Sequence, residues 1–187
     1  DIEEINKKSK IKFNFPFFEK YNGLKIINIG RLTYQKDQMT LLKSFAKLVK
    51  SRNARLLLIG SGSDKNDLID FINEKKINNS VKIIPYTSNP FKYISLCNLK
   101  VLSSRYEGNP NILLEIASLK KLIVSSNCKV GPREILQSGK GGILFKVSND
   151  KQLYLILKKI KINSIKMKKK IETSYKYVKN NFQRDIS

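Results

Sequence analysis

Short, continuously apolar runs alternate with amphipathic segments along most of the chain. Six of these runs are predicted to be buried strands, because each ends at glycine, proline or small polar residues; they cover residues 25–30, 54–60, 81–84, 99–102, 122–124 and 142–145. Apolar side chains recur at helical spacing from Lys36 to Val49, Asp64 is placed to cap the next helix, and a short helix is expected over 90–97. Strands that alternate with helices in this way predict an α/β fold with a parallel sheet of about six strands flanked by helices.

The pattern changes after residue 150. Four apolar side chains there follow the stripe of a helix, and lysines fill much of the remainder: Ile171, Tyr175, Val178 and Phe182, with Lys166, Lys168, Lys169, Lys170, Lys176 and Lys179. We expect a basic C-terminal helix over 151–187. Its lysines form either the solvated face of a helix that packs on the core or a face for anionic lipid.

The chain carries a net charge of +22, from 37 basic and 15 acidic residues. Three explanations remain open: the codon usage of an AT-rich genome, since lysine, isoleucine and asparagine are all abundant; an anionic membrane surface; or nucleic acid. No signature of an RRM, KH or zinc-finger module supports the nucleic-acid reading. No apolar run is long enough to span a bilayer.

Histidine is absent from the chain, which excludes Ser-His-Asp and Cys-His catalysis. Cys97 and Cys128 lie in or beside apolar runs and are interpreted as buried free thiols in a reducing cytoplasm. Without histidine they cannot complete the usual zinc sets, and there is no Walker A sequence, so no metal or cofactor is expected. The chain begins with Asp1 and shows no signal-peptide pattern; we expect a cytoplasmic fragment of a longer protein.

Each of the first four predicted strands ends in glycine-rich or polar residues. These ends are Gly30-Arg31, residues 60–63, residues 85–88 and residues 103–111. The carboxyl ends of parallel strands share one edge of the sheet, and open parallel sheets bind ligands at that edge. The sequence therefore predicts a ligand site formed by these four segments.

Residues 103–115 are predicted to form a turn followed by a helix, with Pro110 at the first helical position. Glu107 lies in the turn, and Glu115 is the only charged residue between Asn111 and Lys120. A lone carboxylate in so apolar a helix is costly to bury. We expect Glu115 either to reach solvent or to meet a hydrogen-bond donor, such as a ligand hydroxyl.

Glu107 and Glu115 are separated by seven residues, and the sequence Glu-Gly-Asn-Pro-Asn-Ile-Leu-Leu-Glu resembles the E-x7-E signature of retaining nucleotide-sugar glycosyltransferases, glycosyltransferase family 4. Residues 30–37 resemble the family's phosphate-binding segment, and residues 131–136 resemble a common later motif. Their order is similar to that of the C-terminal, donor-binding domain of a two-domain GT-B enzyme, over residues 1–150. The resemblance implies a Rossmann-like sheet.

The resemblance also implies a division of the chain. Residues 1–23 would connect two domains, with the aromatic cluster of residues 13–18 covering a core edge or packing on something absent. Residues 24–150 would form the Rossmann-like nucleotide-sugar-binding domain, and residues 151–187 the C-terminal helices. The N-terminal acceptor domain would lie outside this chain, so the fragment alone would turn over little.

The catalytic roles implied by the resemblance fall on Arg31, Lys36 and Glu107. Arg31 and Lys36 would bind the diphosphate, and Glu107 would bind hydroxyls of the transferred sugar. Glu115 would accept hydrogen bonds from the ribose. The alternatives are structural: Arg31 paired with a nearby carboxylate, Lys36 only starting a helix, Glu107 an exposed loop acid, and Glu115 reaching solvent.

Further residues are assigned to substrate binding by the same resemblance. They are Gly30, Gly60, Pro85, Tyr86, Gly108, Asn109, Asn111 and Ile112, with backbone N–H groups contributed by 109–112. Gly60 and Gly62 allow either close approach of a ligand or a plain turn. Tyr86 either stacks on the base or packs elsewhere. Residues 131–134 form either a simple turn and helix start or a segment near the donor sugar.

The implied function is transfer of a hexose or N-acetylhexosamine from a nucleotide diphosphate sugar, such as a UDP-sugar, to a cell-surface glycan or lipid-linked acceptor. Such retaining enzymes need no enzyme nucleophile and no obligatory metal. The alternatives are a hydrolase that uses Glu107 and Glu115 as an acid–base pair, or a basic module that binds nucleic acid or the inner face of an anionic membrane.

Overall fold

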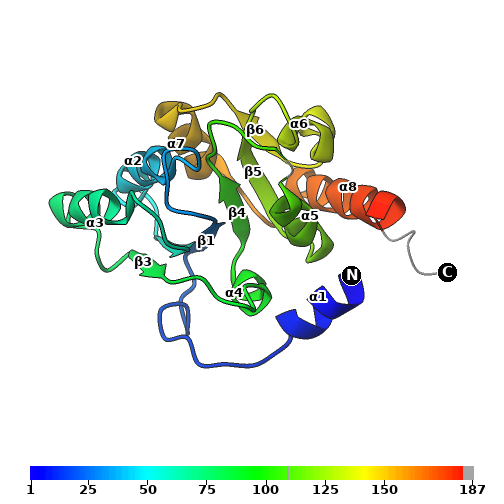
Figure 1. Ribbon diagram of the computed structural model, residues 1–187, viewed down its shortest axis with the longest axis horizontal. Coiled ribbons are helices and arrows are strands. Elements are labelled where there is room, and N and C mark those ends of the chain that lie inside the picture. Colours follow the sequence, from blue (N-terminus) through cyan, green and yellow to red (C-terminus); the bar gives the residue numbers. More distant parts are fainter. Residues whose placement is uncertain (109, 183–187) are drawn as a thin grey trace.

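A computed structural model of the chain describes residues 1–108 and 110–182 (Figure 1). A single parallel sheet contains the strands β1 (Leu24–Ile29), β2 (Ala54–Ile59), β3 (Val81–Ile84), β4 (Leu99–Leu102), β5 (Leu122–Ser126) and β6 (Ile143–Phe145). Their spatial order is β3-β2-β1-β4-β5-β6, and every adjacent pair is parallel. The predicted six-stranded parallel sheet is confirmed.

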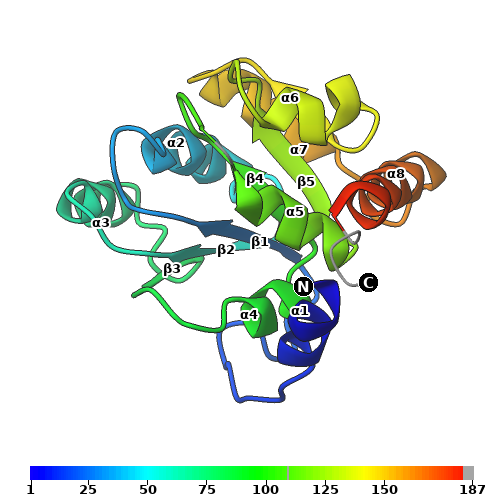
Figure 2. The ribbon, with the colours of Figure 1, turned by 45° about the vertical axis from the view of Figure 1, so that its right-hand side comes forward.

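Helices cover both faces of this sheet. They are α1 (Ile2–Ser9), α2 (Gln38–Leu48), α3 (Lys65–Glu74), α4 (Phe91–Leu96), α5 (Asn111–Ser118), α6 (Pro132–Ile135), α7 (Asp150–Lys159) and α8 (Ile165–Phe182). Figure 2 views β1, β2 and β3 nearly edge-on, with α2 and α3 on one side and α1 and α4 on the other. The fold has three layers, with the sheet in the middle.

Two apolar cores lie on opposite faces of the sheet, because successive strand residues point to opposite sides. In β2, Leu56 and Leu58 belong to the core beneath α2, α3 and α7, whereas Leu57 and Ile59 belong to the core beneath α4, α5 and α8. All four side chains are at most 1% exposed. Burial of this kind stabilises the fold by about 2 kcal/mol per large aliphatic side chain.

Three predicted helix starts differ in detail from the structure. Helix α2 begins at Gln38, not Lys36, because Asp37 has a φ of 48° and caps the helix by accepting from the N–H of Thr40. Asp64 precedes α3 but makes no side-chain cap hydrogen bond; Ser63 Oγ donates to its carboxylate instead. Pro110 stands just before α5, which begins at Asn111.

The buried stripe of α8 lies slightly apart from the predicted one. Met167, Ser174 and Val178 are its buried residues, at 7%, 0% and 2% exposure. Tyr175 lies beside this stripe, where the Nζ of Lys120 sits 4.2 Å from its ring centroid. The side chain of Phe182 falls outside the described part of the chain.

The N-terminal aromatic residues cover an edge of the core. Phe15 packs against Phe18 and against Tyr93 of α4, with ring centroids 5.5 and 5.2 Å apart, and Phe18 is only 3% exposed. Cys97 and Cys128 are buried and free, as predicted. Burial raises the pKa of the Cys97 thiol to about 12.

Candidate functional site

The strand order reverses between β1 and β4. From β1 the chain moves outward to β2 and β3, then returns to β4 on the other side of β1 and moves outward to β5 and β6. The loops after β1 and β4 therefore run over opposite halves of the sheet. The strand ends at such a switch point are where ligands bind in open α/β sheets. Residues 30–37 and 103–108 follow β1 and β4 directly and flank this switch point.

Lys36 and Glu107 meet across it. The Nζ atom of Lys36 lies 2.7 Å from Oε1 of Glu107, and the two side chains are 20% and 5% exposed. Ser104 Oγ donates to the same carboxylate oxygen, and Ser103 Oγ donates to the backbone carbonyl of Lys36 at 2.9 Å. Glu107 is therefore not an exposed loop acid, and Lys36 does more than precede a helix.

Arg31 is exposed at the mouth of the same loop. Its Nη2 donates to Oε1 of Gln35 at 3.3 Å, and Nε2 of Gln35 donates to the carbonyl of Tyr106 at 3.2 Å. Within residues 1–108 and 110–182, no carboxylate lies within ion-pair distance of Arg31. The alternative in which Arg31 pairs with a nearby carboxylate is wrong, and its guanidinium can reach an added anion.

Glu115 lies one turn inside α5, with its side chain half-buried. Burial raises the pKa of its carboxyl, while Lys100 acts against that rise. Asn111 and Ile112 occupy the first two positions of α5, where backbone N–H groups have no acceptor within the helix. Asn109, also assigned to binding, lies outside the described residues.

Lys100 is a component of the site that sequence reasoning missed. Its side chain is 0% exposed, and its Nζ donates to the carbonyl of Ile29 at 3.2 Å, at the carboxyl end of β1. Burial and the nearby Lys36 lower the pKa of this ammonium to about 7, while Glu107 and Glu115 act in the opposite direction. The signal in the sequence was a lysine inside an otherwise apolar strand.

Gly60 and Gly62, in the loop after β2, allow this loop to pack closely against the loop after β1. A Cβ on Gly60 would lie 2.0 Å from the backbone oxygen of Gly30, and one on Gly62 would lie 2.2 Å from that of Leu32. The group that approaches Gly60 is thus the backbone of the neighbouring loop. It is neither a ligand nor part of a plain turn, which were the two alternatives predicted from the sequence. Around Gly108 a Cβ would meet nothing within 4 Å.

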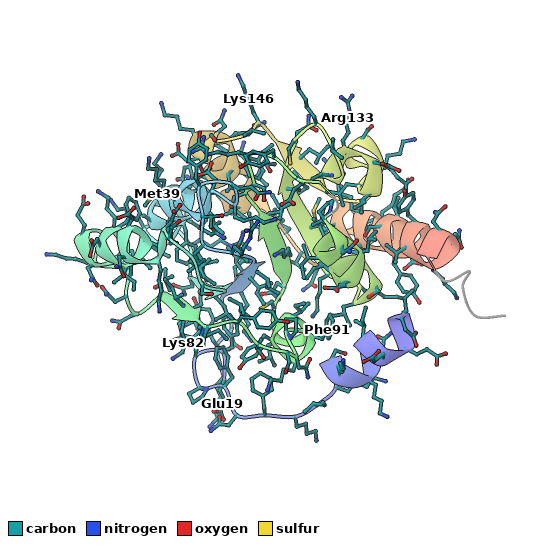
Figure 3. All side chains as sticks on the ribbon, viewed as in Figure 1. Glu19, Met39, Lys82, Phe91, Arg133 and Lys146 are labelled. Carbon is teal, nitrogen blue, oxygen red and sulfur yellow. The ribbon has the colours of Figure 1, made fainter. Side chains whose placement is uncertain are left out.

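Two other predicted segments lie at the same edge. Tyr86 follows β3 and is 77% exposed, so its ring is open to solvent in the structure of this chain. A Cβ on Gly131 would lie 2.4 Å from Cδ of Pro110, which brings the turn before α6 against the start of α5. Arg133 and Lys146 project outward at the edge where the strands end (Figure 3).

The sequence profile of glycosyl transferases group 1 matches residues 8–177 of this chain. An uncharacterized glycosyltransferase of Methanocaldococcus jannaschii is 39% identical over 142 residues, which is 73% of this chain and 35% of that protein. The chain therefore spans about a third of the length of this relative.

Solved structures share the fold. One of them is a mutant of TarM from S. aureus in complex with fondaparinux, alpha-GlcNAc-glycerol and UDP. Its TM-score is 0.79 at 22% identity, and the match covers 92% of this chain and 35% of the TarM chain. The C-terminal domain of a group 1 glycosyl transferase from Francisella tularensis has a TM-score of 0.76 at 17% identity; the match covers 85% of this chain and 86% of that domain.

Proposed function

The chain belongs to the glycosyl transferases group 1 family, and from that premise we propose that it is the donor-binding domain of a retaining glycosyltransferase. Its donor is a UDP-sugar that carries a hexose or N-acetylhexosamine, and its acceptor is a cell-surface glycan or a lipid-linked sugar. The observation that carries the proposal is the meeting of Lys36 and Glu107 at the β1/β4 switch point.

In the proposed reaction the bond between the anomeric carbon and the diphosphate breaks, and negative charge develops on the leaving phosphate. Lys36 and Arg31 stabilise that charge from the β1 loop, and the N–H groups at the start of α5 add aimed donors. Glu107 accepts hydrogen bonds from the transferred sugar. A hydroxyl oxygen of the acceptor attacks on the face from which the diphosphate leaves, and its proton passes to the departing phosphate. Attack on that face retains the anomeric configuration.

Glu115 is suited to bind the ribose. Its carboxylate is half-buried, and no side-chain or backbone donor within the described residues hydrogen-bonds to it. Two hydroxyls of a ribose can supply such donors to one carboxylate. Tyr86 is exposed and follows β3, at one end of the strand order, and is a candidate platform for the base.

The acceptor site is proposed to lie on residues beyond this chain. TarM, which shares the fold over 35% of its own length, was crystallised with UDP and alpha-GlcNAc-glycerol, which supports a UDP-sugar donor and a glycan acceptor for this family member. In this proposal residues 1–23 connect to an acceptor domain and residues 24–150 form the donor domain. Residues 151–187 are the C-terminal helices, which return towards the acceptor domain.

An amide NMR titration tests donor binding on this chain. UDP and UDP-sugars are expected to shift the resonances of residues 30–36 and 104–115, and Arg31→Ala should weaken binding while Lys168→Ala, on the exposed face of α8, should not. An unchanged spectrum would refute the proposal. So would shifts that inorganic diphosphate reproduces in full and that Arg31→Ala leaves intact, because they would indicate adventitious charge.

Assays of the full-length protein test the reaction itself. A screen of nucleotide sugars identifies the donor, and the anomeric configuration of the product tests retention. A product of inverted configuration would contradict the retaining mechanism while leaving donor binding intact. Release of free sugar in place of transfer would favour the hydrolase alternative for Glu107 and Glu115.

An anionic membrane surface is a second proposal, carried by the junction of α7 and α8. Ile165 and Leu155 are 87% and 50% exposed there. Leu155 lines a hollow of about 530 Å³ together with Lys159, Lys161 and Lys166. Exposed apolar side chains ringed by lysines are typical of peripheral membrane contacts. The domain would then work at the inner face of the cell membrane; no helix within the described residues is long and apolar enough to cross one.

Liposome pelleting tests this second proposal. Vesicles with anionic lipid should bind the chain, neutral vesicles should not, and Ile165→Ser should weaken binding at unchanged net charge. Equal binding of Ile165→Ser would refute it. Binding of oligonucleotides, measured over a series of salt concentrations, shows how much binding to any polyanion comes from the net charge alone.

A further inference from the structure

Arg105, in the loop after β4, contacts the loop after β1 at three points. Its backbone N–H donates to the carbonyl of Gln35 at 2.8 Å, and its Nη2 lies 3.2 Å from Oδ2 of Asp37. Its guanidinium carbon lies 4.2 Å from the ring centroid of Tyr34. These partners stand on both sides of Lys36 in the sequence, so Arg105 holds the β1 loop before and after this lysine.

The carboxylate that anchors Arg105 is itself fixed. Asp37 is only 4% exposed, and its Oδ2 also accepts from Oγ of Ser148, in the loop after β6, at 2.9 Å. A planar guanidinium that pairs with a buried carboxylate and lies over the ring of Tyr34 cannot be displaced without losing both contacts. The loops after β1, β4 and β6 are thereby joined at one point.

The guanidinium of Arg105 is directed into the protein. Its Nη2 pairs with Asp37, and its Nε is buried, without a hydrogen-bond acceptor among the described residues. Two of the three guanidinium nitrogens therefore face protein groups, although the side chain is 32% exposed as a whole. This orientation favours a role that Arg105 exerts through the β1 loop over direct contact with a ligand.

Lys36 is placed by the same β4 loop. Ser103 Oγ donates to the backbone carbonyl of Lys36 at 2.9 Å, and Oε1 of Glu107 lies 2.7 Å from its Nζ. Arg105 stands between these two residues in the sequence. Its contacts with the β1 loop therefore complete a set that fixes both the backbone and the ammonium of Lys36.

We propose that Arg105 is a positioning residue of the donor site, which fixes the β1 loop on both sides of Lys36 and so places its ammonium against the leaving diphosphate. The role at the diphosphate rests on the function proposed above; the hold on the loop does not. Loss of the Arg105 side chain leaves Lys36 in the protein but lets its loop move. The ammonium then occupies its binding position for a smaller fraction of the time, and the apparent affinity for a diphosphate falls by that fraction.

A double-mutant cycle tests whether Arg105 acts through Lys36. Isothermal titration calorimetry measures UDP and uridine with the wild type, Arg105→Met, Lys36→Met and the double variant. Arg105→Met should weaken UDP binding about fivefold and leave uridine binding unchanged, but should have no further effect in the Lys36→Met background. Equal weakening in both backgrounds would overturn the proposal, because Arg105 would then contact the phosphates itself. UDP binding that Arg105→Met leaves unchanged would also overturn it.

Arg55 provides the matched control, near the amino end of β2 and so at the opposite edge of the sheet. Its guanidinium carbon lies 4.2 Å from the ring centroid of Tyr21, and its Nη1 donates to the carbonyl of Phe17. Arg55→Met removes the same charge and a similar ring contact, and it should leave UDP affinity unchanged. A loss equal to that of Arg105→Met would contradict the proposal, because charge or stability alone would then explain the effect.

Arg105→Lys covers the case in which Arg105→Met does not fold. The variant keeps the positive charge, but one ammonium cannot pair with Asp37 and also lie over the ring of Tyr34 as a planar fork does. It should weaken UDP binding about threefold and leave uridine binding unchanged. Full wild-type affinity for UDP in this variant would overturn the proposal, because the charge at this position would then suffice.

Amide hydrogen exchange measures the hold on the loop without any ligand. The backbone N–H of Lys36 donates to the carbonyl of Thr33 at 2.9 Å. Arg105→Lys should raise the exchange rate of this amide about threefold, and Arg55→Lys should leave it unchanged. An unchanged rate in Arg105→Lys would overturn the hold on the loop. Failure of the wild type to bind UDP at all would refute the proposed function, whereas the exchange rates would still decide whether Arg105 holds the loop.

Discussion

Lys36 and Glu107, which stand 71 positions apart in the chain, are joined by an ion pair of 2.7 Å between Nζ and Oε1. The pair links the β1 loop to the β4 loop at the switch point of the sheet. It also means that the cation proposed for the diphosphate already has an anionic partner. A diphosphate must therefore compete with Glu107 for Lys36 or share it.

This competition predicts opposite effects for the two members of the pair. Lys36→Met should weaken UDP binding about tenfold and leave uridine binding unchanged, because one charge-assisted contact to phosphate is lost. Glu107→Gln should strengthen UDP binding about threefold, because Lys36 becomes free and a negative charge is removed, while the gain in affinity from the sugar of a UDP-sugar disappears. Isothermal titration calorimetry measures all three ligands.

The control is an ion pair elsewhere. Lys47 of α2 lies 2.5 Å from Oδ2 of Asp150, and Lys47→Met should leave all three affinities unchanged. Weaker UDP binding in Glu107→Gln would contradict the competition and would mean that Glu107 holds Lys36 in its binding position.

The strands could be predicted from the sequence because a parallel strand buried on both faces must be apolar at nearly every position. The same rule concealed Lys100. The run 99–102 is predicted as one of these apolar strands, although its second residue is a lysine that is fully buried. A charge inside such a run is itself a signal, because its burial is costly, but only the fold reveals that Glu107 and Glu115 offset part of that cost.

At other positions, too, the contacts that could not be predicted are those between residues far apart in the sequence. The spacing of Gly60 and Gly62 indicated a close approach, yet the approaching backbone belongs to the Gly30 loop, which no local pattern reveals. Asp37 belongs to the segment that resembles a phosphate site. Its carboxylate is instead occupied by Thr40, Ser148 and Arg105, and two of these come from distant parts of the chain.

Asp37 is therefore predicted to contribute to stability. It is 4% exposed, has a φ of 48°, and pairs with Nη2 of Arg105 at 3.2 Å. Asp37→Ala should lower the free energy of unfolding by about 3 kcal/mol, because the cap, the ion pair and a residue type that tolerates this φ are all lost. Asp37→Asn keeps the helix cap and a residue type that tolerates this φ, so it should lower the free energy of unfolding by about half as much. Urea denaturation measures both; equal losses would show that the charge alone matters.

Gly60 and Gly30 form a matched pair for a steric test. Their φ angles are 155° and 158°, so the backbone preference for glycine is nearly the same at both. A Cβ on Gly60 would lie 2.0 Å from the oxygen of Gly30, whereas one on Gly30 would lie 3.7 Å from side-chain carbons of Lys36. Gly60→Ala should cost about 2 kcal/mol more stability than Gly30→Ala, since backbone must shift at the first position only. Thermal unfolding of the two variants gives the comparison, and equal losses would contradict the close approach.

Lys100 predicts a stability that rises with pH. Its pKa is lowered from 10.5 to about 7 in the folded protein, so between these values the unfolded chain binds more protons than the folded one. The free energy of unfolding should therefore increase as the pH rises from neutral, and the increase is lost again as the pH falls through the folded pKa. Lys121 and Lys170, whose pKa values are also lowered, add smaller effects of the same sign.

Comparison with Lys100→Met isolates the contribution of this one residue. Urea unfolding of both proteins at about pH 7 and about pH 9.5, under reducing conditions, should show the wild type gaining up to about 3 kcal/mol relative to the variant. The other lysines cancel in this difference because both proteins contain them. A difference that does not change with pH would mean that the Lys100 ammonium is as well stabilised in the fold as in water, with Glu107 and Glu115 compensating its burial in full. In that event Lys100 and the two acids act as one fully paired cluster in the absence of ligand.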